Sequence, residues 1–184
     1  MDSRAIVAAL LCAAAARGED RFGARGQVVP FGGIGYSHSA GNGVSSDSVS
    51  LAPGALWFVD DDFALGLSAF FGYRSLSQPT PAASTTRTTS FGGTPMAAVA
   101  LPLSERVAFF PQAGVSYSWQ RVSVPEPGFT QTSHSVILQG FAPLLFIPAP
   151  HFFLGFGPSL SWIVEGAGSD TIAVGLGSQI GGYF

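Results

Sequence analysis

The last fifteen residues, DTIAVGLGSQIGGYF, alternate between large apolar side chains and small or polar ones. Ile172, Val174, Leu176, Ile180 and Phe184 fall in one register, whereas the other register holds mostly glycine, alanine and glutamine. Because successive side chains of a strand point to opposite faces, this pattern predicts a β-strand with one apolar face.

The same period of two recurs along most of the chain, and a helical period is almost absent. Pro30, Pro95 and Pro143 blur the alternation in the first, fourth and sixth of the segments it marks. The pattern predicts eight strands, which lie near residues 27–38, 46–59, 63–76, 87–102, 106–122, 132–147, 152–165 and 171–184.

Short and long connections alternate between these strands. The short ones are DDD at 60–62, LSER at 103–106 and PAP at 148–150, and the longer ones are SAGNGVSSD, SQPTPAASTTR, PEPGFTQT and GAGSD. Short turns at one end and long loops at the other are typical of membrane barrels from bacterial outer membranes. The fold class that we predict is therefore all-β, an eight-stranded antiparallel up-and-down transmembrane β-barrel.

Aromatic residues recur ten positions apart on the apolar register, as in Phe63 with Tyr73 and Phe152 with Trp162. Transmembrane strands span about 9–11 residues and carry aromatic girdles at both interfaces. We predict a lower girdle of Trp57, Phe63, Phe109, Phe146, Phe152 and Phe184, and an upper girdle of Tyr36, Tyr73, Tyr117, Trp119 and Trp162.

Composition supports a membrane location. Charged residues make up 10% of the 184 residues, and 24 residues are glycine. So few charges would leave much of a water-exposed surface apolar, yet the longest apolar run, AIVAALLCAAAA, is shorter than the roughly 20 residues of a transmembrane helix. A closed barrel satisfies both facts. All basic residues are arginines and are scattered, which argues against nucleic-acid binding.

The N-terminus has the pattern of a secretory signal peptide. Arg4 precedes the apolar run, and Ala14 and Ala16 fit the small-residue rule for cleavage. We predict a signal peptide over 1–16, a short periplasmic segment over 17–26 and the barrel over 27–184. Cys12 lies in the predicted signal peptide, so the mature chain is expected to lack cysteine.

The apolar terminal strand must pair with the first strand so that no sheet edge remains. With this strand, the chain resembles the small outer-membrane barrels, such as the membrane domain of outer membrane protein A and the opacity-type proteins. The resemblance implies that the barrel assembly machinery reads IGGYF, at Ile180 and Phe184. Outer-membrane lipid and lipopolysaccharide are then the expected surroundings, and we expect a monomer without a cofactor.

An eight-stranded barrel is only wide enough for side chains to fill it. We therefore predict a structural or surface-interaction role, with the Ser/Thr/Pro-rich long loops outside the cell. Three alternatives stay open. In the first, the glycines, serines and glutamines of the interior form a narrow channel. In the second, the protein is an enzyme that modifies lipid A. In the third, it is a secreted lipocalin-like barrel with an apolar interior.

Catalysis would need a nucleophile, a base and an orienting acid within hydrogen-bond reach. Adjacent residues of a strand point to opposite faces, so neighbouring His and Ser residues do not form such a site, and we predict no enzyme. The three histidines are too far apart in sequence to suggest a metal site. The residues weighed for catalysis are His134 with Ser133 or Ser135, His38 with Ser39, and Glu165.

Arg74 and Glu165 both fall on the inward register near the long loops. An unpaired charge buried in the lumen would be costly. We therefore consider an Arg74–Glu165 ion pair inside the barrel, against the alternative that both side chains reach water at its mouth.

Overall fold

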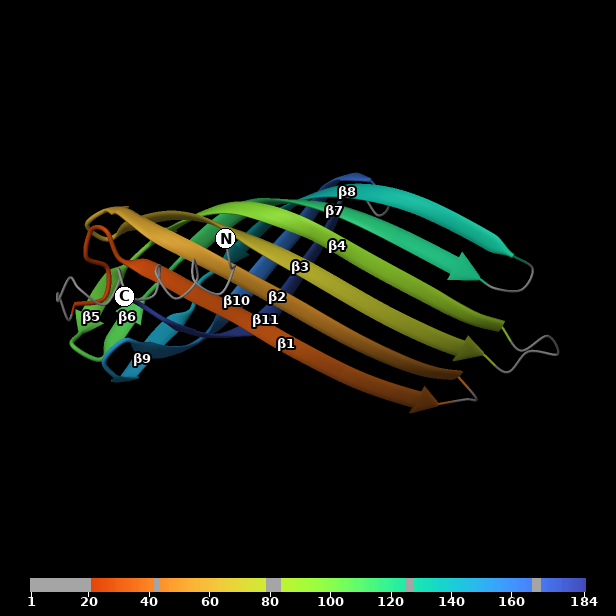
Figure 1. Cartoon of the computed structure of the whole chain (residues 1–184), viewed down its shortest axis with the longest axis horizontal. Helices are drawn as coiled ribbons and strands as arrows, with labels where there is room; N and C mark the ends of the chain where they lie inside the picture. The colour runs from red at the N-terminus through yellow and green to blue at the C-terminus, as the bar shows by residue number, and fades with distance from the viewer. Residues whose placement is uncertain (1–20, 42–43, 79–83, 125–127, 167–169) are drawn as a thin grey trace, which may run out of the picture.

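In the described part of the chain, eleven β-strands form a single antiparallel sheet that closes into a barrel. Figure 1 shows this arrangement in the computed structural model. The structure describes residues 21–41, 44–78, 84–124, 128–166 and 170–184. In this part of the chain, no helix has the length and apolarity needed to cross a membrane. The strands are β1 (Val28–Gly41), β2 (Val44–Asp60), β3 (Phe63–Gln78), β4 (Ser84–Val99), β5 (Leu101–Ser104), β6 (Val107–Phe109), β7 (Gln112–Val124), β8 (Phe129–Phe141), β9 (Leu144–Ala149), β10 (Phe152–Gly166) and β11 (Thr171–Gly182).

The eight predicted strands are confirmed as the eight segments that cross the barrel wall, which we call staves. Three of these staves are each divided into two strands. The segments predicted at 87–102, 106–122 and 132–147 correspond to β4 with β5, β6 with β7, and β8 with β9. Two of the three breaks contain a proline, Pro111 or Pro143, which has no N–H to donate to a neighbour. Backbone bonds bridge these breaks, from Val99 N to Pro111 O (3.0 Å) and from Phe110 N to Pro143 O (2.9 Å).

The barrel has two unlike ends. At one end, which we call the turn end, short turns join β2 to β3, β5 to β6 and β9 to β10, and the C-terminus lies there too (Figure 1). Asp62 and His151 make these turns tight with φ angles of 63° and 64°. At the other end, the loop end, β1–β2, β3–β4, β7–β8 and β10–β11 are connected. The predicted alternation of ends is confirmed, but the predicted long loop SAGNGVSSD is wrong, because its residues pair as β1 and β2 with only residues 42–43 between the two strands.

The two faces of the sheet differ as the alternation predicts. Large apolar side chains such as Leu67 (65% exposed) and Leu176 (74% exposed) point outward. The inward face is small and polar only in its middle and upper part. Toward the turn end, the inward face carries large buried side chains instead. These include Leu56, Phe58, Phe110, Leu145 and Phe153.

Inward glycines make room for these rings. At Gly181, an added Cβ would lie 2.5 Å from Cζ of Phe153 and 2.6 Å from the carbonyl oxygen of Pro30. The glycine on β11 is therefore the counterpart of the inward phenylalanine on β10, and the alternation of small and large residues fits a narrow interior.

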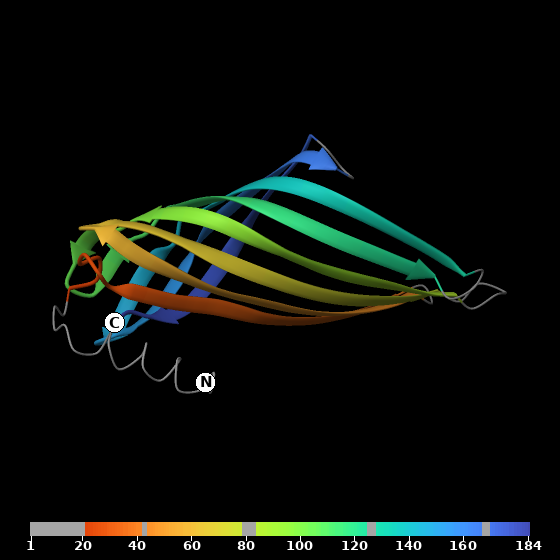
Figure 2. The ribbon, with the colours of Figure 1, turned by 45° about the horizontal axis from the view of Figure 1, so that its top comes forward.

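The terminal strand closes the barrel as predicted. β11 pairs with β10 from Gly182 to Thr171. With β1, it pairs through Phe31–Gly181 and Gly32–Ile180, and Val28 and Phe184 exchange backbone bonds of 2.9 and 3.0 Å. Past Gly32, β1 and β11 have no registered partners across the seam among the described residues. Figure 2 shows the loop end of β11 directed away from β1.

We predict that this seam pairs to its ends in a bilayer. If the register of Gly32 with Ile180 continues residue by residue along both strands, Gly41 at the end of β1 pairs with Thr171 at the start of β11. Unpaired backbone groups facing hydrocarbon cost several kcal/mol each, which favours pairing. Ser39 and Ala173 would then be a non-hydrogen-bonded pair with Cα atoms about 4.5 Å apart, within the range of a disulfide.

A Ser39→Cys/Ala173→Cys variant in membranes is expected to form a disulfide under mild oxidation, seen as a mobility change on a non-reducing gel. The control is Ser39→Cys/Ile172→Cys, whose second thiol lies on the opposite face. Equal cross-linking in the two variants, or none in either, contradicts the continued register.

Candidate functional site

The lumen is closed at the turn end by a cluster of aromatic rings. Phe22, which precedes β1, lies at its centre and is 4% exposed. Its ring makes edge contacts with four others, with centroid distances of 5.1 to 5.8 Å. We call this cluster the aromatic plug; the four surrounding residues are Phe58, Phe110, Phe153 and Tyr183.

The segment that carries Phe22 is fixed by a set of polar contacts. Gln27 accepts hydrogen bonds from the backbone of Gly23 (3.0 Å) and Ala24 (3.2 Å), and its Nε2 donates to Arg21 O (2.8 Å). Arg21 binds both oxygens of Asp62 at 2.7 Å. Residues 21–26, which belong to the predicted short periplasmic segment, thus pack against the turn end of the barrel. The predicted signal peptide at 1–16 and residues 17–20 lie outside the described residues.

Polar side chains fill the middle of the lumen above the plug. Gln112 on β7 donates from Nε2 to Oε1 of Gln179 on β11 at 2.8 Å, and both side chains are buried. Thr94 and Ser116 form a second buried hydrogen bond of 2.8 Å. Nε2 of Gln179 has no hydrogen-bond partner among the described residues. This layer can therefore hold water, because a buried donor without a partner is costly.

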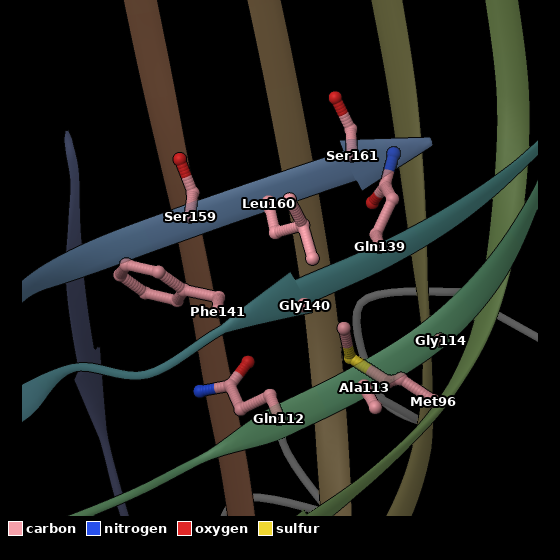
Figure 3. A pocket seen from close by; sticks show the side chains of 10 residues that line it. All are labelled: Met96, Gln112, Ala113, Gly114, Gln139, Gly140, Phe141, Ser159, Leu160 and Ser161. Atoms are coloured by element: carbon pink, nitrogen blue, oxygen red, sulfur yellow. The ribbon is translucent and has the colours of Figure 1, made fainter. Parts of the chain in front are cut away.

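A cavity of about 250 Å³ adjoins this layer, between β7, β8 and β10 (Figure 3). Among the described residues, no charged side chain lines this cavity. Its polar side chains come from three strands and are Gln112, Gln139, Ser159 and Ser161. Phe141 and Met96 add apolar surface. The cavity offers hydrogen bonds to water or a neutral polar group, but no acid, base or nucleophile activated by a neighbouring base.

The structure does not form the ion pair considered for Arg74 and Glu165. Arg74 points inward and donates from Nε to Oγ of Ser46 at 3.0 Å. In β10, the register shifts between Ile163 and Glu165, so that Glu165 pairs with Val136. Val136 pairs with Tyr117, whose ring is outward, so the bulge turns Glu165 to the exposed outward face.

The two candidate histidine groups lie near the loop end, on the outward face. Nδ1 of His38 lies 2.8 Å from Oδ1 of Asp47, to which the hydroxyl of Tyr36 donates at 3.0 Å. These contacts, from His38 first and then Tyr36, lower the pKa of the Asp47 carboxyl from its usual value. Nδ1 of His134 lies 3.1 Å from the hydroxyl of Tyr117.

Neither histidine is hydrogen bonded to an adjacent serine. The pairing of β7 with β8 sets His134 opposite Trp119 and Ser135 opposite Ser118, so the two side chains occupy opposite faces. Ser39 follows His38 and likewise points to the other face. Within the described residues, no group of three or more His, Cys, Asp or Glu is arranged to hold a metal ion.

All predicted girdle residues lie on the outward register, and none is buried. Exposed fractions reach 70% at Tyr36 in the upper set and 57% at Trp57 in the lower set. Phe91, which sequence reasoning did not assign, joins the upper set and packs on Trp119 at 4.8 Å between ring centroids. The remaining members are Phe63, Phe109, Phe146, Phe152 and Phe184 below, and Tyr73, Tyr117 and Trp162 above.

The two residues of the predicted assembly signal differ in their surroundings. Ile180 points outward and is 50% exposed. Phe184 is partly exposed, stacks on His151 with rings 6° from parallel, and pairs through its backbone with Val28. Reading of these residues by the barrel assembly machinery stays a prediction.

Comparison with family models found no match to this chain, and comparison with curated proteins found none either. Among solved structures, the chain is similar to Ail, the attachment invasion locus protein of Yersinia pestis, solved with the heparin analogue sucrose octasulfate. Identity is 15%, the TM-score is 0.54, and the match covers 86% of this chain and 98% of Ail. This likeness shows the fold.

Two further solved structures match with lower TM-scores. The N-terminal β-barrel domain of Pseudomonas aeruginosa OprF matches at 13% identity and a TM-score of 0.48, covering 87% of this chain and 98% of that one. Neisserial surface protein A matches at 20% identity and a TM-score of 0.38, covering 85% and 92%. The closed antiparallel barrel and the likeness to Ail show that the chain has the fold of the small eight-stranded outer-membrane barrels, as the sequence predicts.

The plug gives a direct prediction for stability. Replacing Phe22 with alanine removes the central ring and leaves a cavity among four others, which typically costs about 3–5 kcal/mol. Phe22→Ala is expected to lower the temperature at which the folded barrel in detergent converts to the unfolded gel band. Phe129→Ala is the control, because Phe129 is 53% exposed at the loop end. Equal effects of the two changes would show that the plug does not hold the turn end together.

Proposed function

We propose that this chain is an outer-membrane β-barrel with a structural or surface-interaction role and without catalysis, placed in the membrane after removal of residues 1–16. The proposal proceeds from the fold shared with Ail and from the two faces of the sheet. The cell surface then lies at the loop end, and the periplasm at the turn end.

The outward face supports the membrane location. Large apolar side chains are exposed on every stave, and many are more than 40% exposed. A patch of this extent is far larger than monomeric soluble proteins expose, whereas hydrocarbon matches it. The lipocalin-like alternative needs apolar residues throughout the lumen, and the Gln112–Gln179 and Thr94–Ser116 pairs oppose it.

The observation that carries the surface role is the length of three hairpins. β1–β2, β3–β4 and β7–β8 remain paired well past the upper girdle residues Tyr36, Tyr73 and Trp119. Figure 1 shows these hairpins extended at the loop end. β3 continues for five residues beyond Tyr73, which corresponds to about 17 Å at 3.4 Å per residue. A barrel that only spanned the bilayer would not need this extension. Paired hairpins rich in Ser and Thr offer a stiff polar surface to a partner.

A narrow channel is the second candidate, because the polar cavity near Gln112 can hold water. The aromatic plug opposes it, since buried apolar rings occupy the lumen at the turn end. A steady single-channel conductance of the wild-type protein in planar bilayers would favour this candidate over the surface role.

Labelling of intact cells tests the proposed orientation. Ser77 is exposed on a long hairpin at the loop end, and Ser104 is exposed at a turn. We expect a membrane-impermeant maleimide to label Ser77→Cys on intact cells, and to label Ser104→Cys only after the outer membrane is permeabilised. Labelling of Ser104→Cys alone on intact cells would reverse the orientation, and equal labelling of both would refute the membrane location.

A further inference from the structure

A groove of about 560 Å³ runs over the outward face of β3, β4 and β7. Leu67, Ala69 and Pro95 are among the residues that line it. Gly93 leaves the middle of the groove open, because an added Cβ would meet only the carbonyl oxygen of Ser68, at 3.8 Å. The rings of Phe91 and Trp119 lie on its loop-end side. The groove is therefore an apolar slot at the depth of the membrane-facing band.

Two arginines lie just beyond the aromatic pair. Arg121 occupies the next outward position after Trp119, and Arg87 the second outward position after Phe91. The register pairs Thr89 with Arg121 and Arg87 with Ser123, so the arginines are diagonal neighbours on β4 and β7. Side chains so placed are within reach of one group, because diagonal neighbours lie about 7–8 Å apart.

The other described arginines are placed differently. Arg21 is bound to Asp62, and Arg25 and Arg106 lie at the turn end. Arg74 points inward and is bonded to Ser46. Arg87 and Arg121 are therefore the described arginines that face outward at the loop end, and both are exposed.

Among the described acidic residues, none is paired with Arg87 or Arg121. The described ion pairs are Arg21–Asp62 and His38–Asp47. Asp47 lies two strands from Arg87, with Ser75 between them, and is engaged by Tyr36 and His38. Glu165 pairs with Val136 and is separated from β7 by β8.

We propose that this face binds one molecule of lipopolysaccharide, with an acyl chain in the groove and a lipid A phosphate between Arg87 and Arg121. Two guanidinium groups match a phosphate in charge and in hydrogen-bond geometry. Their place beyond an aromatic girdle is the level of lipid headgroups. The apolar groove lies deeper in the membrane than the two arginines, in the same order as the acyl chain and the phosphate of lipid A. This inference rests on the proposed outer-membrane location.

The test measures binding of purified lipid A to the folded barrel in detergent. Trp119 fluorescence reports binding at the groove in a Trp57→Phe/Trp162→Phe background. We expect saturable binding that weakens by at least about tenfold in Arg87→Gln/Arg121→Gln, because each lost guanidinium removes a charge-assisted hydrogen bond to the phosphate. Gly93→Leu should also weaken it by filling the groove. Arg106→Gln, at the turn end, should bind like the parent.

A second readout keeps the native tryptophans. Lipid A should raise the unfolding temperature of the wild-type barrel, and should raise it less in Arg87→Gln/Arg121→Gln. Equal binding of lipid A and its dephosphorylated form, or an unchanged affinity in the arginine variant, would overturn the site. Failure of the proposed location is a separate result, because binding in detergent does not depend on where cells place the protein.

Discussion

Closure of the sheet is the constraint on which the rest of this structure depends. Each backbone N–H and C=O at membrane depth needs a partner on a neighbouring stave, and a barrel supplies partners on both sides of every stave. Closing eight staves leaves an interior that side chains must fill. The interior is filled without overlap where a small inward residue lies beside a large one, as Gly181 lies beside the ring of Phe153.

The interior changes in character from one end to the other. The aromatic plug around Phe22 seals the turn end with apolar contacts, and the Gln112–Gln179 pair begins a polar layer above it. Arg74 reaches Ser46 near the loop end. Stability is therefore concentrated at the turn end, whereas the long hairpins at the loop end are free to vary in the groups they present. This division is consistent with the proposed role, in which the packed barrel anchors the hairpins that face a partner.

Much of the fold follows from the sequence, because period-two alternation sets both the strands and their faces. The features that the alternation does not predict depend on contacts between residues distant in sequence or on local irregularities of a strand. Phe22 stands alone in a charged segment, so no pattern predicts that it fills the turn end. The bulge before Glu165 turns that side chain outward, and a strict alternation cannot show such a shift. Arg87 and Arg121 become neighbours only through the β4–β7 register.

The central claim is that the apolar register faces lipid and the small register faces a closed interior. A gel of the outer-membrane fraction, comparing cold with boiled samples, tests it most directly. Closed membrane barrels commonly stay folded in cold detergent, so the account predicts a band in this fraction that changes mobility on boiling. A soluble periplasmic protein without a shift would contradict the account, and the inward and outward registers would have to be exchanged.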